Sequence, residues 1–561
     1  MRLLIKAATF VTRRQWKRWH KLTSKPEETQ NRLLRDIIER NRSTRFGGDH
    51  RFKSIGSLSD YRNQVAIGDY ERVRPYVELI HHGERDSLTA EPIDMFTMTS
   101  GSTGEPKLIP VTAKTRENHR QLTRLWYYRA LVDHPDLFNG KLLGIVSPAV
   151  EGETAGGIPF GAASGLIYQS SPRWIKNTYA VPSRVSEIKD FEARYYLIMR
   201  LALEQDISFF GTPNPSTILK LVQSASHNKY DIIKDIHDGT ITSRFDVPAQ
   251  VRASLGSRLG KNLPRARRLE SLIKHDGALR PKEYWPRLQL IGCWKGGSAG
   301  VRLKEFAGWF AKTTPVRDLG YMASEGQMTL PIFDSGSAGI LAIDKNFYEF
   351  IPESEINASA PTILTCSELE EGSLYYIILT TPGGLYRYDI NDVVRVAGFY
   401  NQTPLIEFVR KGRDVTSITG EKLHVNQLIG AMARAQRAAG VAVQHFCACA
   451  DVEKSLYVVS VELDGAMPSR QTLVQLLHEL DAGMREFNVE YAQKRESQRL
   501  GSPILCVMKP GWFERKAEII LQRGGRDTQL KAQLLCTIPE DPNEIQFIVQ
   551  SAGAAPIKNS D

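Results

Sequence analysis

Between Thr97 and Lys107 the chain carries a run of glycines and small hydroxyl residues of the kind that can bind a polyanion. Eight residues of this segment are Gly, Ser, Thr or Lys, in the order Thr97-Met98-Thr99-Ser100-Gly101-Ser102-Thr103-Gly104-Glu105-Pro106-Lys107. Glycines let backbone N–H groups approach a phosphate, hydroxyls add donors, and the lysine adds positive charge. The segment does not match the P-loop pattern G-x-x-x-x-G-K-[ST]. Taken alone, it is compatible with a phosphate-binding loop or with a plain surface loop.

Two later segments carry side chains that would complete a nucleotide site. Asp318-Leu319-Gly320-Tyr321-Met322-Ala323-Ser324-Glu325-Gly326 places an aromatic ring four residues before a carboxylate. Leu385-Tyr386-Arg387-Tyr388-Asp389-Ile390-Asn391-Asp392 places an acid after a Tyr-Arg pair. The order of the three segments matches the order of the motifs in adenylate-forming enzymes: a Ser/Thr/Gly phosphate loop, a Y-x-x-[ST]-E element, and a Tyr-Arg element followed by Asp.

The chain resembles the auxin-responsive (Gretchen Hagen-type) acyl-acid amido synthetases of the adenylate-forming superfamily, and it looks like a bacterial-type member. Beyond the three motifs, the resemblance includes Thr44-Arg45-Phe46-Gly47, Tyr70 to Tyr76, Gly420-Glu421-Lys422-Leu423 and Lys509-Pro510-Gly511. Two positions depart from the family pattern. Asn391 stands where the family usually has Gly, and Lys531-Ala532-Gln533-Leu534 replaces the frequent K-x-P-R, so the resemblance implies no role for Lys531.

The resemblance implies an enzyme that uses ATP and Mg²⁺ to activate a carboxylic acid as an acyl-adenylate, releasing pyrophosphate. An amine, usually that of an amino acid, then attacks the acyl carbon and releases AMP. The implied phosphate ligands are Thr99, Ser100, Gly101, Ser102, Thr103, Gly104 and Lys107. Glu325 would ligate Mg²⁺, which suits a hard cation. Asp392 would accept the ribose hydroxyls.

Other residues would complete the nucleotide site in such an enzyme. Tyr321 and the neighbouring Ser324 would lie at the adenine, whose pocket Gly296, Gly297 and Ser298 would line. Lys422 would neutralise charge on the α-phosphate, with a surface lysine as the alternative interpretation. Arg410 and Arg413 would reach the nucleotide from a mobile domain.

The acyl pocket and the base for aminolysis are less well indicated. In this family the helix after the phosphate loop lines the acyl pocket, and here it carries Arg120, Arg124 and Tyr127. An arginine there could bind a carboxylate, although core packing explains the aromatic residues equally well. The carboxylate substrate needs no base because it is already ionised at neutral pH. For the amine, His119, His424 and His445 are candidates by residue type only.

The elements around these motifs predict an α/β fold. From about residue 90 to 343, short apolar strands alternate with helices, which is typical of a largely parallel sheet. The expected strands are Met95–Met98, Leu142–Ser147, Ser208–Phe210, Leu288–Cys293 and Ile340–Ile343, and the expected helices are Lys114–Val132, Asp190–Glu204, Ser216–Ser224 and Leu303–Ala311. Residues 27–85 are expected to be helical, with Ser59-Asp60 capping a turn.

The second half of the chain predicts a meander followed by a smaller α/β unit. The expected meander strands are Leu374–Thr381, Leu385–Tyr388, Val393–Ala397 and Pro404–Val409. After the charged turn Arg410–Asp414, helices are expected at 426–439, 469–486 and 512–523, and strands at 441–450, 455–463 and 503–509. We therefore expect a large adenylation domain of residues 1–410, a hinge at about 410–415, and a small lid domain of residues 415–561.

The charge of the chain is concentrated at its start. The formal net charge is +10, and residues 1–25 hold eight of these charges and no acid: Arg2, Lys6, Arg13, Arg14, Lys17, Arg18, Lys21 and Lys25. A nucleic-acid-binding protein carries its charge on the working face of a fold, so this distribution argues against nucleic acid. We expect a helix that packs its aromatic residues on the body and is dispensable for chemistry. Weak contact with an anionic membrane stays open, because Phe10, Trp16 and Trp19 interleave with the cations.

The cysteines and the absence of long apolar runs indicate a cytoplasmic monomer. The six cysteines form no C-x-x-C, and we expect buried, reduced thiols. Cys447 and Cys449 are expected to point to opposite faces of a strand and to share no metal. No apolar run reaches the roughly 18–20 residues of a transmembrane helix, and no signal peptide is expected.

Three alternative functions stay open on the sequence. An acyl-CoA ligase would share the adenylation step and differ in its acceptor, a thiol in place of an amine. A scaffold without activity would have no use for Lys107, Glu325 and Asp392 together. A serine hydrolase is suggested by Gly296-Gly297-Ser298-Ala299-Gly300, which matches the G-x-S-x-G nucleophile elbow.

Overall fold

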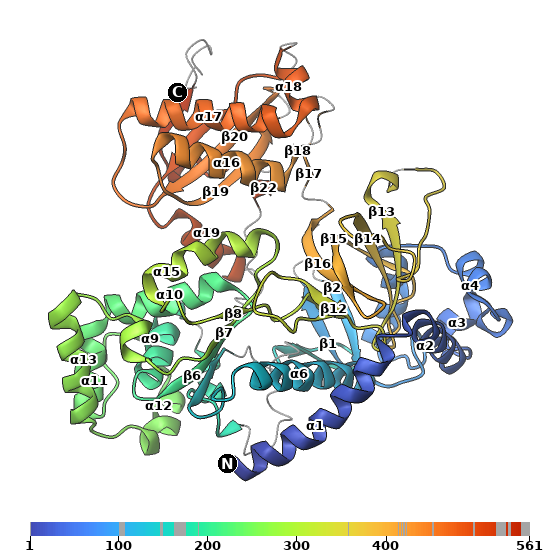
Figure 1. Cartoon of the computed structure of the whole chain (residues 1–561), viewed down its shortest axis with the longest axis horizontal. Helices are drawn as coiled ribbons and strands as arrows, with labels where there is room; N and C mark the ends of the chain where they lie inside the picture. Colours follow the sequence, from blue (N-terminus) through green and yellow to red (C-terminus); the bar gives the residue numbers. More distant parts are fainter. Residues whose placement is uncertain are drawn as a thin grey trace. The chain divides into compact units, whose positions relative to one another are not determined.

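The computed structural model describes two compact units, Met1–Val409 and Arg410–Asp561 (Figure 1). The described residues are 2–99, 107–145, 150–161, 176–188, 190–356, 358–412, 415–416, 418, 421, 423–451, 454–496, 500–522, 534–536 and 540–550. Among these residues, no helix is long and apolar enough to cross a membrane.

A parallel sheet forms one half of the first unit. Its order is β3-β6-β7-β8, with bounds Lys141–Gly144, Ile207–Gly211, Leu290–Gly292 and Val316–Arg317. Alternate residues point to opposite faces of a strand. Leu142, Phe209 and Leu290 therefore pack against α6 (Ala113–Asp133) on one face, in a cluster that also contains Trp126. The next residue of each strand lies in the separate core on the other face.

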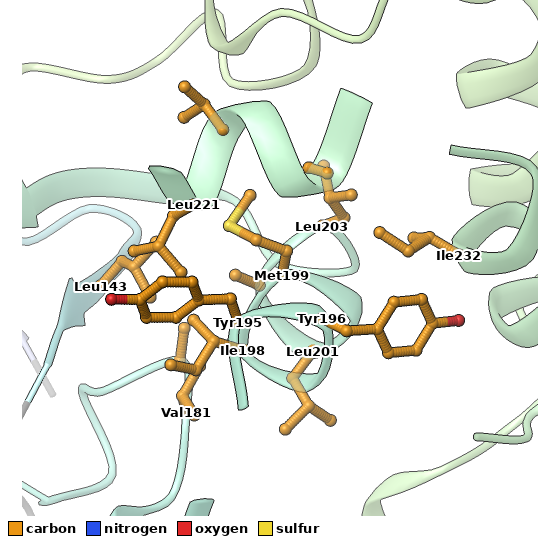
Figure 2. Close-up of a cluster of buried hydrophobic side chains, with 14 of the residues drawn as sticks. Leu143, Val181, Tyr195, Tyr196, Ile198, Met199, Leu201, Leu203, Leu221 and Ile232 are labelled. Atoms are coloured by element: carbon orange, nitrogen blue, oxygen red, sulfur yellow. The ribbon is translucent and has the colours of Figure 1, made fainter. Parts of the chain in front are cut away.

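Helices cover that other face and form the largest apolar cluster of the unit. The cluster centres on α9 (Phe191–Ala202), whose Tyr195, Tyr196 and Met199 are buried among residues of β3, α10 and α11 (Figure 2). The helical elements of this region are η2 Ser183–Glu187, α10 Pro215–His227, α11 Lys229–Asp238, α12 Ala249–Leu255, η3 Gly256–Arg258, α13 Leu263–Asp276, α14 Pro281–Tyr284, η4 Gly297–Glu305 and α15 Phe306–Trp309. Helices on both faces explain why the strands are continuously apolar.

The phosphate-loop segment connects the two strands of a hairpin. β1 (Ile93–Thr99) pairs antiparallel with β2 (Lys107–Thr112), and Thr99 lies opposite Lys107. The sheet order is β2-β1-β5-β4, with β4 at Gly152–Glu153 and β5 at Pro159–Gly161. Helix α6 follows β2 directly and is capped by Thr112.

An antiparallel sheet of order β11-β12-β16-β15-β14-β13 forms the other half of the unit. Its strands are β11 Thr329–Leu330, β12 Gly339–Leu341, β13 Phe347–Pro352, β14 Leu374–Thr380, β15 Tyr388–Tyr400 and β16 Thr403–Lys411; the small hairpin β9 Met322–Ala323 with β10 Gly326–Gln327 and the turn η5 Glu353–Glu355 accompany it. The strand expected at Leu385–Tyr388 is wrong, because only Tyr388 belongs to a strand. That strand is β15, which continues through the whole of the strand expected at Val393–Ala397.

A β-bulge explains how β15 stays continuous. Ile378 of β14 pairs with Asp389, and Tyr376 pairs with Val393. Between these two pairs β14 has one residue, whereas β15 has the three residues Ile390 to Asp392. Asn391, within the bulge, has a φ of 56°. Glycine adopts this left-handed conformation freely, and asparagine is among the non-glycine residues that tolerate it best. Asn391 can therefore adopt the left-handed conformation that the bulge requires.

The N-terminal helices are α1 Arg2–Leu22, α2 Pro26–Arg40, α3 Arg45–Asp49, η1 Phe52–Ser54, α4 Leu58–Gln64 and α5 Tyr70–His81. Ser57 caps α4 in a capping box with Asp60, so the predicted Ser59 cap is wrong and Ser59 lies inside the helix. The second half of α1 packs on the body of the first unit through its aromatic residues, as expected. Trp19 is buried with its Nε1 donating to Asp344 at 2.9 Å, and the Thr23 carbonyl accepts from Thr403 Oγ1 at 2.9 Å.

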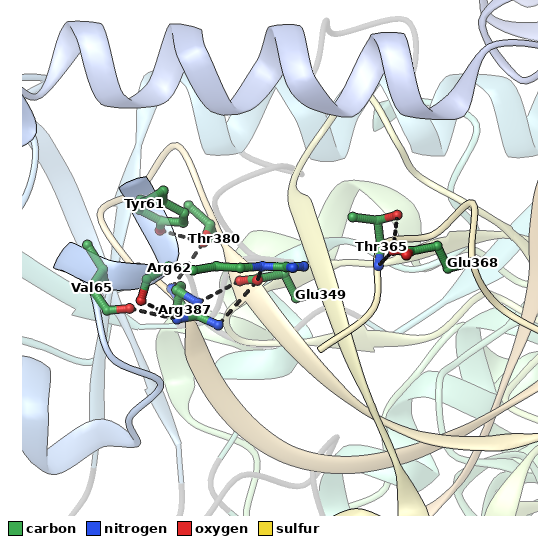
Figure 3. Close-up of polar contacts among 8 residues, drawn as sticks. All are labelled: Tyr61, Arg62, Val65, Glu349, Thr365, Glu368, Thr380 and Arg387. Atoms are coloured by element: carbon green, nitrogen blue, oxygen red, sulfur yellow. Dashed lines mark hydrogen bonds and ion pairs between the residues drawn. The ribbon is translucent and has the colours of Figure 1, made fainter. Parts of the chain in front are cut away.

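A buried ion pair joins the helical N-terminus to the antiparallel sheet (Figure 3). The Arg387 guanidinium donates to both carboxylate oxygens of Glu349, at 2.7 and 3.2 Å, and to the Val65 carbonyl at 2.8 Å. Arg62 contacts the same carboxylate at 2.8 Å. The arginine of the Tyr-Arg motif therefore stabilises the scaffold, and its guanidinium is already occupied within the protein.

The second unit is a five-stranded sheet with helices. Its order is β22-β19-β20-β21-β23. The bounds are β17 Val415–Thr416, β18 Leu423–His424, α16 Val425–Ala439, β19 Val443–Asp451, β20 Leu456–Leu463, α17 Arg470–Phe487, α18 Val489–Glu496, β21 Ile504–Met508, α19 Trp512–Gln522, β22 Leu535–Cys536, η7 Pro542–Glu544 and β23 Ile545–Gln550. Cys447 and Cys449 face the same side of β19, in one buried cluster. The expected opposite orientation is wrong because side chains two residues apart share a face.

Candidate active site

The loops after β7 and β8 lie at the carboxyl edge of the parallel sheet, where ligands bind in open α/β folds. Asp318, the first residue after β8, connects the two loops through hydrogen bonds. Its carboxylate accepts from the Lys295 and Gly320 backbone N–H groups, both at 2.6 Å, and its carbonyl accepts from Trp126 Nε1 at 2.8 Å. Burial raises the pKa of Asp318 to about 6, against the effect of the two N–H donors. The Asp318 carboxylate thus joins the two loops, and its backbone carbonyl contacts α6.

Tyr321, three residues later, contacts the aspartate of the third motif. Its hydroxyl donates to Asp392 Oδ2 at 2.5 Å, and its ring lies 5.5 Å from the Phe408 ring at an interplanar angle of 30°. Tyr321 and Asp392 are both buried. The β15 bulge presents Asp392 at this point, a device frequently found beside active sites. The structure therefore brings the second and third motifs together.

Glu325 lies beside the same strand. Tyr388 Oη donates to Glu325 Oε1 at 3.4 Å, and burial is the main reason why the pKa of Tyr388 rises. The Ser324 carbonyl accepts from Thr97 Oγ1 at 3.4 Å. Because Thr97 belongs to β1, this contact ties the Y-x-x-[ST]-E element to the strand that leads into the phosphate loop.

Two residues flank the phosphate loop at the ends of its hairpin. Thr99 ends β1, and Lys107 begins β2 with its ammonium 5.6 Å from the centroid of the Tyr70 ring. Ser100, Gly101, Ser102, Thr103 and Gly104 lie outside the described residues. The first motif therefore begins on β1, and Thr97 of this strand contacts Ser324 of the second motif.

Gly296 and Gly297 pack closely against β16. A Cβ on Gly296 would lie 3.0 Å from the Phe408 carbonyl oxygen, and one on Gly297 would lie 3.1 Å from the Phe408 ring. Gly297 also has a φ of 57°, so a side chain there would strain the backbone as well. These glycines therefore let their loop approach the aromatic residue that packs on Tyr321.

The serine-hydrolase alternative loses its structural basis here. A nucleophile elbow is a sharp turn directly between a strand and a helix. In this chain Cys293 to Gly296 separate β7 from the 3₁₀ helix η4, and Ser298 lies within that helix. The match to G-x-S-x-G does not correspond to an elbow.

The candidate acyl-pocket residues of α6 already have partners within the protein. Arg124 forms an ion pair with Glu117 at 2.6 Å, and Arg120 contacts the same carboxylate at 3.5 Å. The Tyr127 ring lies 5.7 Å from Phe209 and 5.8 Å from Phe138. Burial raises its pKa. These contacts favour a packing role for Tyr127.

The candidate residues of the second unit are only partly described. Arg410 is buried at the end of β16, whereas Arg413 and Lys422 lie outside the described residues. Glu421, the neighbour of Lys422, is buried and accepts from the Ile418 N–H at 2.8 Å and from Tyr457 Oη at 2.7 Å. These contacts fix the chain at Glu421, which precedes Lys422 in the sequence.

Four contacts at this site were not predicted from the sequence: those of Thr97, Asp318, Tyr388 and Phe408. Thr97, Asp318 and Tyr388 stand inside the quoted motifs, so the sequence indicated their positions but not the residues that they contact. Phe408 belongs to a strand, where its residue type matches many core positions.

Comparison with known proteins assigns most of the chain to one family. Residues 15–315 match the GH3 family N-terminal domain, residues 339–411 the GH3 family central domain, and residues 426–540 the GH3 family C-terminal domain. The chain is 24% identical over 542 residues to "Indole-3-acetic acid-amido synthetase GH3.4" of Arabidopsis thaliana, covering 91% of this chain and 89% of that protein.

Solved structures show the same fold. "AtGH3.15 acyl acid amido synthetase in complex with 2,4-DB" matches with a TM-score of 0.83 at 22% identity, covering 96% of this chain and 97% of that chain. A 2-hydroxyisobutyryl-CoA ligase in the postadenylation state matches with a TM-score of 0.51 at 12% identity, covering 93% and 88%. The predicted α/β architecture is confirmed. Since the three family domains span most of its length, this chain belongs to the GH3 family.

Proposed function

We propose that this protein is an acyl-acid amido synthetase that adenylates a carboxylic acid with ATP and joins the acyl group to an amine, with an amino acid as the amine donor. The observation that carries the proposal is the convergence of Tyr321, Asp392 and Glu325 beside the strand that enters the phosphate loop. The relative from Arabidopsis thaliana bears the name of an amido synthetase, which supports amide formation over thioester formation.

In the adenylation step the protein has to hold a nucleotide and disperse its charge. Asp392, oriented by the Tyr321 hydroxyl, accepts hydrogen bonds from the ribose, and the Tyr321 ring provides an aromatic surface for adenine. Donors of the loop 99–107 bind the phosphates, with Lys107 adding positive charge. We further propose that Lys422 and Arg413 contribute positive charge to the binding of the nucleotide phosphates.

The carboxylate of Glu325 fits a magnesium ion. Mg²⁺ binds through one or two carboxylates plus phosphate oxygens, and Glu325 lies next to a tyrosine hydroxyl on a segment tied to β1. A bound Mg²⁺ would neutralise phosphate charge during adenylation. Tyr388, through its hydrogen bond, orients the Glu325 carboxylate for this role.

The experiment measures pyrophosphate release with ATP, Mg²⁺ and a panel of carboxylic acids, followed by mass analysis of products formed with amino acids or with coenzyme A. We expect acid-dependent pyrophosphate release and an amide product. Glu325→Gln should lower the adenylation rate about 100-fold or more, because a metal contact contributes several kcal/mol to the transition state.

Glu84→Gln provides the matched control. Glu84 is a glutamate of the same unit that forms an exposed pair with Arg45 at 3.4 Å. It should leave pyrophosphate release unchanged. Wild-type rates in the Glu325→Gln variant would refute the assigned metal ligand, and thioester formation in place of amide would identify an acyl-CoA ligase.

A further inference from the structure

Four of the six cysteines gather in one cluster of the second unit. Cys447 and Cys449 belong to β19, Cys506 to β21 and Cys536 to β22, and all four are buried. Cys449 lies opposite Cys536 in the parallel pairing of β19 with β22. This clustering is unrelated to the nucleotide motifs and plays no part in the proposed function.

Two of these thiols and one carboxylate are arranged at metal-ligand distances. Cys447 Sγ lies 3.7 Å from Cys536 Sγ and 3.3 Å from Glu540 Oε1. The three ligand atoms all lie within 4.8 Å of one another. Tetrahedral zinc, with Zn–S near 2.3 Å and Zn–O near 2.0 Å, requires about 3.8 Å between two sulfurs and about 3.5 Å between sulfur and oxygen. We propose that Cys447, Cys536 and Glu540 form a structural zinc site.

The surroundings supply what such a site needs. Trp512 Nε1 donates to Glu540 Oε2 at 3.1 Å and fixes the carboxylate, as outer partners of metal ligands commonly do. Cys449 lies opposite Cys536 in the strand pairing but does not belong to the group of three ligand atoms.

Lys516 is a cationic partner of Glu540 within the protein. Its ammonium forms an ion pair with Glu540 Oε1, the same oxygen that faces Cys447. Zinc and this ammonium therefore compete for one oxygen. Removal of the lysine charge should strengthen metal binding, whereas removal of a ligand should weaken it.

The consequence of zinc binding would be structural. Glu540 follows β22 in the chain, and Cys447 belongs to β19, an interior strand of the sheet. A metal held by all three residues would cross-link β19, through Cys447, to the chain at Cys536 and at Glu540. Soft thiolate ligands select zinc over magnesium, so this ion differs in kind from the one proposed for Glu325.

The test uses the full-length protein, reduced and stripped with a chelator, and titrated with Co²⁺ as a spectroscopic substitute for zinc. We expect a thiolate-to-cobalt charge-transfer band that saturates at one ion per chain and disappears when Zn²⁺ is added. Cys447→Ser, Cys536→Ser and Glu540→Gln should each weaken cobalt binding about tenfold or more. Lys516→Gln should strengthen it.

Cys366→Ser is the control, because Cys366 is an equally buried thiol of the first unit. It should leave the band and its saturation unchanged. Circular dichroism of each variant shows whether it still folds. Glu540→Gln lies outside the apolar core, so weaker cobalt binding in this variant reports loss of a ligand rather than loss of folding. The proposal is overturned if the wild-type protein shows no charge-transfer band, if the band survives in Cys447→Ser and Cys536→Ser, or if Lys516→Gln weakens binding as Glu540→Gln does.

Discussion

At the scale of single residues, Asp392 is expected to determine how strongly the protein prefers a ribonucleotide to a 2′-deoxyribonucleotide. Asp392→Ala should raise the KM for ATP about 10- to 100-fold, because hydrogen bonds to a charged group contribute about 1.5–3 kcal/mol. The wild-type protein should bind 2′-deoxy-ATP less well than ATP, and the variant should bind both alike. ATP–pyrophosphate exchange with each nucleotide measures this difference.

Tyr321→Phe is the partner variant for that prediction. It keeps the ring that packs on Phe408 and removes only the hydroxyl that contacts Asp392 at 2.5 Å. An intermediate rise in KM with retained discrimination is expected, since the carboxylate stays but is less well oriented. If Asp392→Ala discriminated between the two nucleotides as the wild type does, the ribose assignment would be wrong.

The family and the reaction class were predictable from the sequence because three short motifs in a fixed order carry them. The contacts between the motifs were not. Residue types indicated Tyr321 and Asp392 separately, but their hydrogen bond depends on a bulge in β15, and a bulge leaves no period-two pattern to detect. Arg387, quoted as part of a nucleotide motif, instead forms a buried ion pair with Glu349.

At the scale of elements, the Arg387–Glu349 pair should contribute strongly to the stability of the first unit. Both side chains are nearly inaccessible, at 3% and 1% exposure. Arg387→Met should lower the free energy of unfolding by about 3–5 kcal/mol, because it leaves a buried carboxylate with less compensation. Urea unfolding followed by tryptophan fluorescence suits this test, since seven of the eight tryptophans belong to the first unit.

Arg287→Met is the matched control for this pair. Arg287 pairs with Asp206 at 2.9 Å but is 77% exposed, so the loss should stay within about 1 kcal/mol. The double variant Arg387→Met, Glu349→Met should recover part of the stability, because apolar side chains can replace a buried ion pair. Equal effects of the two single substitutions would contradict the role given to the buried pair.

Long elements with a clear period were predicted well, and short ones were not. The helix expected at 426–439 is α16, and the strand expected at 455–463 is β20. The two-residue strands β8, β17 and β22 offer no period to detect, and they exist because neighbouring strands pair with them. Leu303–Ala311 was expected to be one helix, but it is a 3₁₀ helix followed by the short α15.

At the scale of the whole molecule, the N-terminal helix is expected to matter for stability rather than for chemistry. A chain that begins at residue 27 loses Trp19, which is 3% exposed, and should be about 3–5 kcal/mol less stable. A chain that begins at residue 9 keeps Trp19 and its bond to Asp344, and should melt like the full-length protein. Thermal melting of both chains distinguishes them; equal melting temperatures would show that α1 is separable.

The last prediction concerns the boundary between the two units. Two half-reactions have to share one acyl-adenylate: pyrophosphate leaves after the first, and the amine enters for the second. A small domain on a hinge can serve both steps. The contact boundary falls between Val409 and Arg410, and Gly412 forms the turn after β16. Gly412→Pro restricts this turn and should slow adenylation, amide formation or both, with little change in the affinity for ATP.

Gly412→Ala provides the control, because alanine adds a side chain without fixing φ. It should stay close to the wild type in both half-reactions. Single-turnover pyrophosphate release measures the first step, and amide formation from the accumulated acyl-adenylate measures the second. A rate loss in Gly412→Pro but not in Gly412→Ala follows from a moving hinge, since proline fixes φ whereas alanine leaves the common backbone conformations accessible. If Gly412→Pro turned over normally in both steps, the residues after β16 would form a fixed linker, and the amine would have to reach the acyl-adenylate without movement of the second unit.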